Sequence, residues 1–210
     1  MWVFPETDVL NYGFSTMETL FTMTPFVYLF LIPAITMRTF AEEKKSGTME
    51  LLLTRPLTDT QIIVGKYLAS WFLVFLSLLP TLVYYFSIVE LGSPIGNIDT
   101  AAVIGSYIGL LLLGGVFTSI GVFASSITDN QIIAFILAVF FCIIFYSGLT
   151  SLAQLSLWEG SAYLISQLGI DFHYGAMSKG LIDSRNVIYF FSIISIFLYL
   201  TALVLRSRKW

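Results

Sequence analysis

Charged side chains are scarce in this sequence of 210 residues, which holds ten basic residues, thirteen acidic residues and a single histidine. Hydrophobic residues make up 57% of the chain, and the mean hydropathy is +0.88. A soluble domain of this length could not bury so much apolar surface. The composition therefore excludes a soluble globular protein and indicates that lipid surrounds most of the chain.

Cysteine and histidine are each present only once, which limits the metal and disulfide chemistry open to the chain. Cys142 lies inside an apolar run and has no second cysteine with which to form an intrachain disulfide. His173 lies close to Asp171 but has no cysteine or second histidine near it. This pattern is more typical of an interfacial histidine than of a metal ligand, so we expect no metal site.

The phosphate-binding motif G-x-x-x-x-G-K-[ST] is also missing. Gly65-Lys66 resembles its end, but Tyr67 follows where a hydroxyl residue is required, and the pair lies at the start of an apolar run. Without a phosphate cradle and a magnesium site, the chain cannot bind and hydrolyse ATP by itself. We therefore expect it not to be an enzyme and to bind no cofactor.

Long apolar runs are what the sequence does contain. Five of them can cross a hydrocarbon core of about 30 Å at about 1.5 Å per helical residue. They cover about residues 20–37, 67–89, 101–127, 132–152 and 187–205, and none contains Asp, Glu, Lys, Arg or His. The chain is thus predicted to be a single all-α membrane domain, residues 1–210, built as a polytopic bundle of five spans.

The basic residues predict the orientation of this bundle. Eight fall on one side, in the 38–66 segment and at the C-terminus, whereas only Lys179 and Arg185 fall on the other. By the positive-inside rule the first side is cytoplasmic, and the C-terminus with it, in a cell inner membrane. The outer side then holds segment 153–186, which is too polar to span and suits short interfacial or re-entrant helices.

Small residues mark the third apolar run. Gly105 and Gly109 form a G-x-x-x-G pair, and Gly115 follows within the same run. Such residues let helix backbones approach closely, so we expect tight helix packing there. An alternative is a helix that shifts against its neighbours during a transport cycle. The third and fourth runs are joined by Thr128-Asp129-Asn130, which predicts a tight turn.

Eight of the charged residues fall between Arg38 and Asp59, which makes residues 38–66 the candidate contact with a polar partner. Met49, Leu52 and Leu53 have the spacing of one face of a short helix, and Glu50 lies in its first turn, where the helix dipole favours a carboxylate. Pro56 disfavours a helical conformation at the residue before it, so the helix should end by then.

A second helix is predicted to begin directly after this one. Thr58 and Gln61 have the spacing of a capping box, in which the two side chains satisfy each other's free amides. This helix continues into the second apolar run. The short cytoplasmic helix is therefore tied at both ends to membrane spans, an arrangement that can pass a push from a soluble protein into the bilayer.

These residues resemble the coupling-helix region of type-2 ABC transporter (ABC-2) permeases. The resemblance rests on a pattern that ends before Gly65-Lys66 and comprises Glu43, Gly47, Thr48, Met49, Glu50, Leu51, Leu52, Leu53 and Pro56. Within the class, residues 37–40 and 180–185 look like the permease subunit associated with gliding motility in Bacteroidota. The resemblance covers nearly the whole chain.

The resemblance implies a six-helix permease that pairs with a second permease, as a homodimer or a heterodimer, and engages an ABC ATPase through the residues just named. ATP and Mg would then be bound by that ATPase, and the remaining partner would be the lipid bilayer, with no nucleic acid. The sequence departs from this pattern by showing five spans. The first span of the family is the one that is missing, which agrees with a predicted start on the outer side.

Three other functions stay open at this stage. An intramembrane hydrolase could use Ser147 with His173, although the usual nucleophile motif and a charged orienting group are missing. An ion-coupled transporter or channel usually carries ionisable groups at mid-membrane, and none lies within the five runs. The third possibility is an ABC-linked envelope scaffold that does not itself move a solute.

Overall fold

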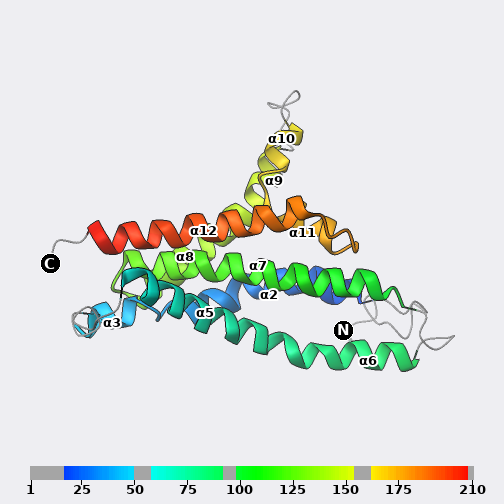
Figure 1. Ribbon diagram of the computed structural model, residues 1–210, viewed down its shortest axis with the longest axis horizontal. Helices are drawn as coiled ribbons and strands as arrows, with labels where there is room; N and C mark the ends of the chain where they lie inside the picture. Colours follow the sequence, from blue (N-terminus) through cyan, green and yellow to red (C-terminus); the bar gives the residue numbers. More distant parts are fainter. Residues whose placement is uncertain (1–16, 50–57, 92–97, 154–161, 208–210) are drawn as a thin grey trace.

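The computed structural model describes residues 17–49, 58–91, 98–153 and 162–207, and within these ranges the chain forms helices joined by short turns, with no strand (Figure 1). Five helical segments are long and apolar enough to cross a membrane. They are Glu18–Lys45, Asp59–Glu90, Thr100–Ile127, Gln131–Ala153 and Ser184–Ser207. The predicted polytopic bundle of five spans is therefore confirmed.

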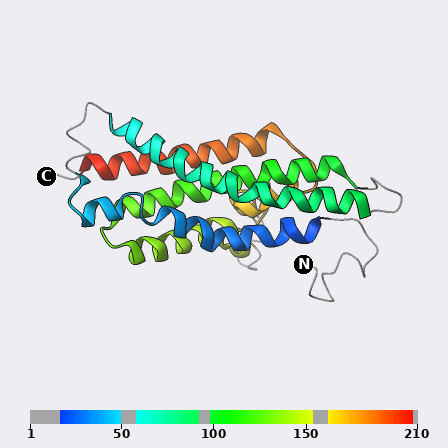
Figure 2. The same ribbon diagram turned by 90° about the horizontal axis from the view of Figure 1, so that it is seen from below.

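Several of these segments contain more than one helix. The order of elements is α2 (Glu18–Thr36), α3 (Ala41–Lys45), α5 (Asp59–Leu78), the 3₁₀ turn η1 (Leu79–Thr81), α6 (Leu82–Leu91), α7 (Thr100–Ile127), α8 (Gln131–Ile143), the π-helical turn η2 (Ile144–Gly148), α9 (Leu149–Ala153), α10 (Ala162–Ser166), α11 (Ile170–Met177) and α12 (Ser184–Ser207). Figure 2 shows the long helices running along a common direction.

Helix α7 is the centre of the bundle and packs against α2, α5, α8, α11 and α12. It is apolar around its whole circumference, as expected of a helix that neighbours cover on every side. Leu113, Phe117 and Ile120 are fully buried along it. The other spans keep one face on α7 and turn the opposite face outward, as Phe30 of α2 and Phe86 of α6 do.

The glycines of α7 lie where its neighbours approach most closely. A Cβ atom on Gly105 would stand 2.8 Å from the backbone oxygen of Met177, and one on Gly109 would stand 3.3 Å from the Cβ of Met177. A Cβ on Gly115 would stand 3.0 Å from the hydroxyl of Tyr67 in α5. Gly105 and Gly109 therefore face α11, whereas Gly115 faces α5 and α12.

The helix boundaries follow local sequence signals. The Thr58 hydroxyl accepts a hydrogen bond from the backbone N–H of Gln61 (3.3 Å), and Gln61 Oε1 accepts one from the N–H of Thr58 (2.9 Å), which confirms the capping box. Asn130 caps α8 by accepting from the N–H of Ile132 (2.9 Å), and the predicted turn at 128–130 is confirmed. Because its cap starts at Thr58, α5 begins well before the apolar run that marks the second span.

Two features of the half of the molecule away from α3 were not predicted in detail. The fourth span contains the π-helical turn η2, after which α9 and α10 project away from the bundle (Figure 1). Helix α11 instead folds back and packs on α7, where Ile170, Tyr174 and Met177 are buried. Of the two alternatives predicted for segment 153–186, interfacial or re-entrant helices, α11 thus fits the re-entrant one.

Candidate functional site

Helix α3 is held in place by a serine from the central helix. Ser125, in the last turn of α7, accepts hydrogen bonds from the backbone N–H groups of Phe40 and Ala41, each 3.0 Å long. Its hydroxyl donates in turn to the backbone oxygen of Met37 (3.0 Å). These N–H groups begin a helix and have no partner within it. A side chain of α7 therefore caps the N-terminus of α3.

We expect Ser125→Ala to loosen α3 while leaving the bundle intact. The substitution leaves two N–H groups without an acceptor near the buried residues Phe40 and Ala41, which should lower the free energy of unfolding by about 1–3 kcal/mol. Hydrogen exchange should then be faster at residues 40–45. Ser119→Ala is the matched control, because this buried hydroxyl of α7 donates only to its own helix, at Val116. Unchanged exchange in Ser125→Ala would contradict the capping role.

An ion pair joins α3 to the start of α5. Lys66 Nζ lies 2.5 Å from Glu43 Oε1 and also donates to the backbone oxygen of Thr39. The same ammonium lies 4.9 Å from the centre of the Phe40 ring. The two side chains are only 19% and 28% exposed, for Lys66 and Glu43 respectively. Glu43 is therefore engaged within the chain, and the pair fixes the polar segment to the second span.

Met49, at the end of the described part of the polar segment, is buried against the bundle. It is 2% exposed and packs with Phe40, Ile62 and Ile63 in a small apolar cluster at this end of the bundle. The apolar spacing that predicted a surface for a partner is also the spacing of a face turned onto the protein itself. Met49 thus anchors the segment to its own chain and leaves no side-chain surface for a partner.

The turn after α3 depends on a glycine. Gly47 has a φ of +70°, a conformation that favours glycine, and follows directly on the residue that ends the helix. The Thr48 hydroxyl lies 2.8 Å from that of Ser46. The remaining residues of the predicted coupling set, Glu50, Leu51, Leu52, Leu53 and Pro56, lie outside the described residues.

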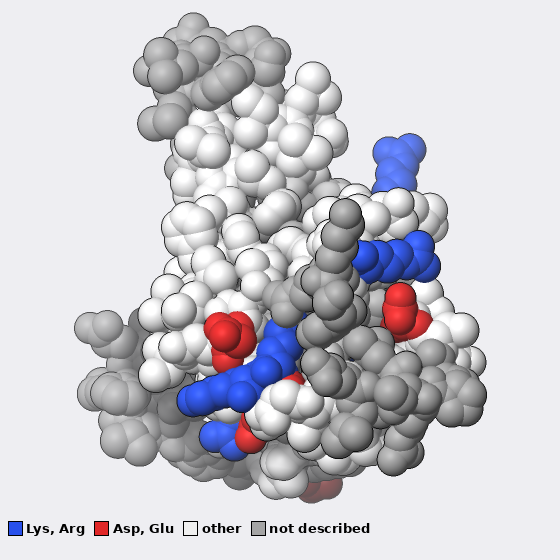
Figure 3. Space-filling model, turned by 90° about the vertical axis from the view of Figure 1, so that its left-hand side faces the viewer, with Lys and Arg blue, Asp and Glu red and all other residues white. Residues whose placement is uncertain are grey.

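Charged side chains of both signs gather at this end of the molecule (Figure 3). Of the described basic residues, Lys179 and Arg185 belong to the opposite end, and the others lie near α3, the start of α5 and the end of α12. Arg206 Nε lies 3.9 Å from Asp59 Oδ2 across two exposed side chains, so this pair adds little stability. Acidic side chains lie among the basic ones on this face, so it is polar and of mixed charge.

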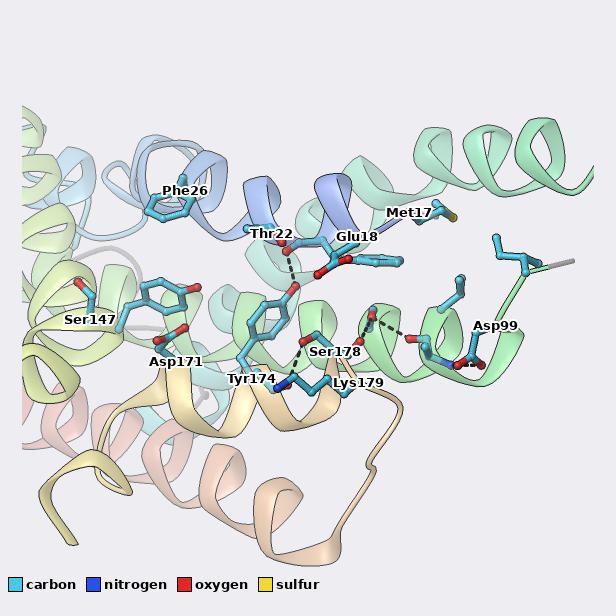
Figure 4. Close-up of a pocket in the computed structure, with 17 residues that line it drawn as sticks. Met17, Glu18, Thr22, Phe26, Asp99, Ser147, Asp171, Tyr174, Ser178 and Lys179 are labelled. Atoms are coloured by element: carbon cyan, nitrogen blue, oxygen red, sulfur yellow. Dashed lines mark hydrogen bonds between the residues drawn. The ribbon is translucent and has the colours of Figure 1, made fainter. Parts of the chain in front are cut away.

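A cavity of about 620 Å³ lies in the other half of the molecule, between α2, α7, η2 and α11. Figure 4 shows Glu18 and Phe26 of α2 facing Asp171 and Tyr174 of α11 across it. Glu18, Asp99 and Lys179 are exposed and form its rim, whereas Tyr146 is buried in its wall. Its size and its mixture of apolar walls with a few polar groups are those of a small-molecule site.

Asp171 is a functional candidate that the sequence reasoning missed. Helix α11 runs against α7 so that Met177 meets Gly105 and Tyr174 meets Gly109, and Asp171 lies one turn further along. This depth is close to the middle of α7 (Thr100–Ile127). The five apolar runs carry no charge, but the fold-back of α11 places a half-buried carboxyl group at spanning depth. Ionisable groups at this depth often mark a substrate or ion pathway.

The residues of the hydrolase alternative are not joined in the structure. The Ser147 hydroxyl donates to the backbone oxygen of Ile143 in its own helix (3.4 Å). Both ring nitrogens of His173 have other partners, Asn186 Oδ1 and the backbone oxygen of Gln167, each at 2.8 Å. His173 also stacks on Tyr189, with ring centres 3.9 Å apart. It therefore ties α11 to α12 and activates no nucleophile.

The fold and these two sites define a polytopic helical membrane protein with a charged face at one end and a cavity in the other half. The family model described as ABC-2 family transporter protein matches residues 5–206. The chain therefore belongs to the ABC-2 transporter family and is a membrane permease of the ABC transporter class. This family supplies the membrane component of such transporters and not the catalytic one. A comparison with curated proteins finds no match.

Proposed function

We propose that this chain is the permease subunit of an ABC-type export complex that a separate ATPase drives through residues 43–56. The supporting observation is the way the structure ties the start of this segment to the bundle. Ser125 links α3 to α7, and the Glu43–Lys66 pair links it to α5. A force applied to the segment would therefore act on three spans at once, since α2 leads directly into it.

In this proposal the face around α3 lies in the cytoplasm, as does the C-terminus, and the protein resides in the inner membrane. The excess of basic residues at this end supports that orientation. ATP and Mg bind to the partner ATPase, and a second permease, identical or related, completes the membrane part. The cavity beside Asp171 favours export over a purely structural scaffold, because a scaffold needs no ligand-sized space.

The sequence phrases at 37–40 and 180–185 further support a role in gliding motility. In the structure, both of these sequence segments form turns next to the ends of spans. Residues 37–40 hold the turn that Ser125 caps, and Gly180 adopts a φ of +81° where the chain passes close to Ala102. Deleting the gene in a gliding bacterium should abolish spreading on agar, and a copy of the gene should restore it. Normal spreading of the deletion strain would reject this subtype.

Glu50→Lys tests the docking proposal. Reversing this charge should reduce recovery of the ATPase with the affinity-tagged permease about tenfold or more. The interaction of the carboxylate with a basic or amide donor on the partner would be lost, and the new ammonium would repel a basic group there. Insertion and yield of the permease should be unchanged. Glu90→Lys is the matched control, since this exposed carboxylate ends the second span at the opposite end of the bundle. Equal recovery of the ATPase with both variants would refute docking through this segment.

A further inference from the structure

Among the described residues that line the cavity between α2, α7, η2 and α11, one carboxyl group lies away from the rim. Of the lining residues, Glu18, Asp99 and Lys179 are exposed, and Asp171 is half-buried beneath them. Asp99 already accepts a hydrogen bond from the backbone N–H of Ala102 (3.1 Å) as the cap of α7. Asp171 is therefore the carboxylate best placed to meet a ligand that enters the cavity.

Aromatic side chains surround this carboxyl group. Asp171 lies beside the hydroxyl of Tyr146, whose ring is packed edge to face against Phe26 and Phe117, at 6.4 and 6.0 Å between ring centres. Tyr174 follows on the next turn of α11, and its hydroxyl donates to the backbone oxygen of Phe21 (2.7 Å). The rings are thus fixed in position before any ligand arrives. Aromatic faces next to a carboxylate favour a positively charged group.

The net charge of the cavity lining also favours a positively charged ligand. Its lining carries three carboxylates, Glu18, Asp99 and Asp171, against the single ammonium of Lys179. In the low-dielectric surroundings of a membrane protein, an unmatched carboxylate at spanning depth is costly unless something compensates its charge. A cation that carries apolar groups would compensate that charge and would also cover the apolar wall.

We propose that this cavity binds an amphipathic organic cation, with its positive centre beside Asp171 and its apolar body against Tyr146 and Phe26. The inference rests on the proposed export function and gives it a substrate class. A cavity of about 620 Å³ is large enough for one such molecule. Glu18 and Asp99 at the rim would draw the cation in, and Asp171 would hold it at depth.

Binding of tetraphenylphosphonium to the permease in lipid nanodiscs tests the proposal directly. We expect saturable binding by equilibrium dialysis of the radiolabelled cation, weakened about tenfold or more in Asp171→Asn because a charge-assisted contact is lost. Asp171→Glu should keep binding within about threefold. Tetraphenylborate, which has nearly the same shape and the opposite charge, should not compete for the site. Unchanged binding in Asp171→Asn, or equal competition by tetraphenylborate, would overturn the proposal.

Asp183→Asn is the matched control for the loss of a carboxylate. Asp183 lies in the same outer segment but is not part of the cavity lining. Its pKa is lowered because the backbone N–H of Arg185 donates to its carboxylate (3.0 Å), so the side chain is charged at neutral pH. Its replacement should leave binding of the cation unchanged, and a loss equal to that in Asp171→Asn would overturn the specific site.

The two proposals fail in different ways. Glu50→Lys should keep full binding of tetraphenylphosphonium, because α3 and Met49, which directly precede Glu50, lie in the other half of the molecule from the cavity. If the ATPase is recovered normally with the wild-type permease but the cation does not bind, the cation site is wrong and the permease assignment stands. If the cation binds through Asp171 but no ATPase is recovered, the cavity stands and docking is wrong.

Discussion

Lys66→Glu is expected to destabilise the permease and to uncouple it from its ATPase. The substitution places a carboxylate where an ammonium lies 2.5 Å from Glu43 Oε1, and it removes the donor to the backbone oxygen of Thr39. Removal of one partner of a buried pair costs about 3–5 kcal/mol, and the partial exposure of this pair reduces the value to about 2–3 kcal/mol. For a chain of this size the Tm should fall by about 5–10 °C. Thermal unfolding of the purified protein, followed by tryptophan fluorescence, measures this shift.

The reversed pair Glu43→Lys with Lys66→Glu separates the charge interaction from other effects. If attraction between the two side chains holds α3 to α5, the double variant should recover at least half of the Tm lost by Lys66→Glu. Full recovery is not expected, since the cation also lies 4.9 Å from the centre of the Phe40 ring. Lys179→Glu provides the control, because this exposed lysine forms no ion pair among the described residues. A double variant no more stable than Lys66→Glu would show that the pair is not what joins the two helices.

The sequence was sufficient to predict the architecture because lipid imposes a simple rule on it. Apolar runs long enough to cross a bilayer must be helical, since every backbone polar group there needs a partner within the chain. The five runs, the cap at Thr58 and the turn at 128–130 all follow from local signals of this kind. Their boundaries are less predictable, because a helix such as α5 continues beyond the lipid wherever its cap is placed.

The cavity could not be predicted in the same way, because its residues meet only in three dimensions. Asp171 lies in a polar segment for which the sequence left interfacial and re-entrant helices open, and it reaches spanning depth only because α11 folds back on α7. Small residues in α7 were the one available signal. Gly105 and Gly109 show that something approaches closely, but the sequence cannot show whether a spanning helix or a re-entrant one does so. A charge count along the apolar runs therefore underestimates the polar chemistry of this membrane domain.

The structure of the polar segment between the first two spans was predicted in part, and its docking on an ATPase stays a prediction. Its polarity and its position between two spans follow from the sequence, and so does the helix start at Thr58. The sequence did not indicate that Glu43 would pair with Lys66 or that Met49 would be buried. A charged or apolar residue in a short segment can contact its own bundle or another protein. The sequence spacing of such residues is the same in both cases, so it cannot distinguish them. Glu50 thus becomes the more informative position for a partner, because two of its neighbours in the pattern serve the chain itself.

Gly121→Ala is expected to disturb the contact between α7 and α2 more than any other single methyl addition to α7. A Cβ at this position would stand 2.0 Å from Thr36 Oγ1 and 2.8 Å from Thr36 Cβ, so one of the two helices must shift. Overpacking of this kind costs about 1–3 kcal/mol and occasionally more, and here we expect about 3 kcal/mol. The Tm should fall by about 10 °C. Because Thr36 immediately precedes the turn capped by Ser125, ATPase recovery should decrease as well.

Thr36→Ala in the same chain should restore at least half of that loss. The Thr36 hydroxyl donates to the backbone oxygen of Ile32 (2.9 Å) in its own helix, so removing this hydroxyl breaks no hydrogen bond to another helix. Gly65→Ala is the matched control, since a Cβ there meets nothing within 4 Å and alanine is the better helix former. This variant should be at least as stable as the wild type. If Gly121→Ala unfolds at the wild-type temperature, the close approach of α2 to α7 is not a feature of the folded protein. The polar segment would then act on the bundle through the Ser125 link to α7 and the Glu43–Lys66 pair with α5.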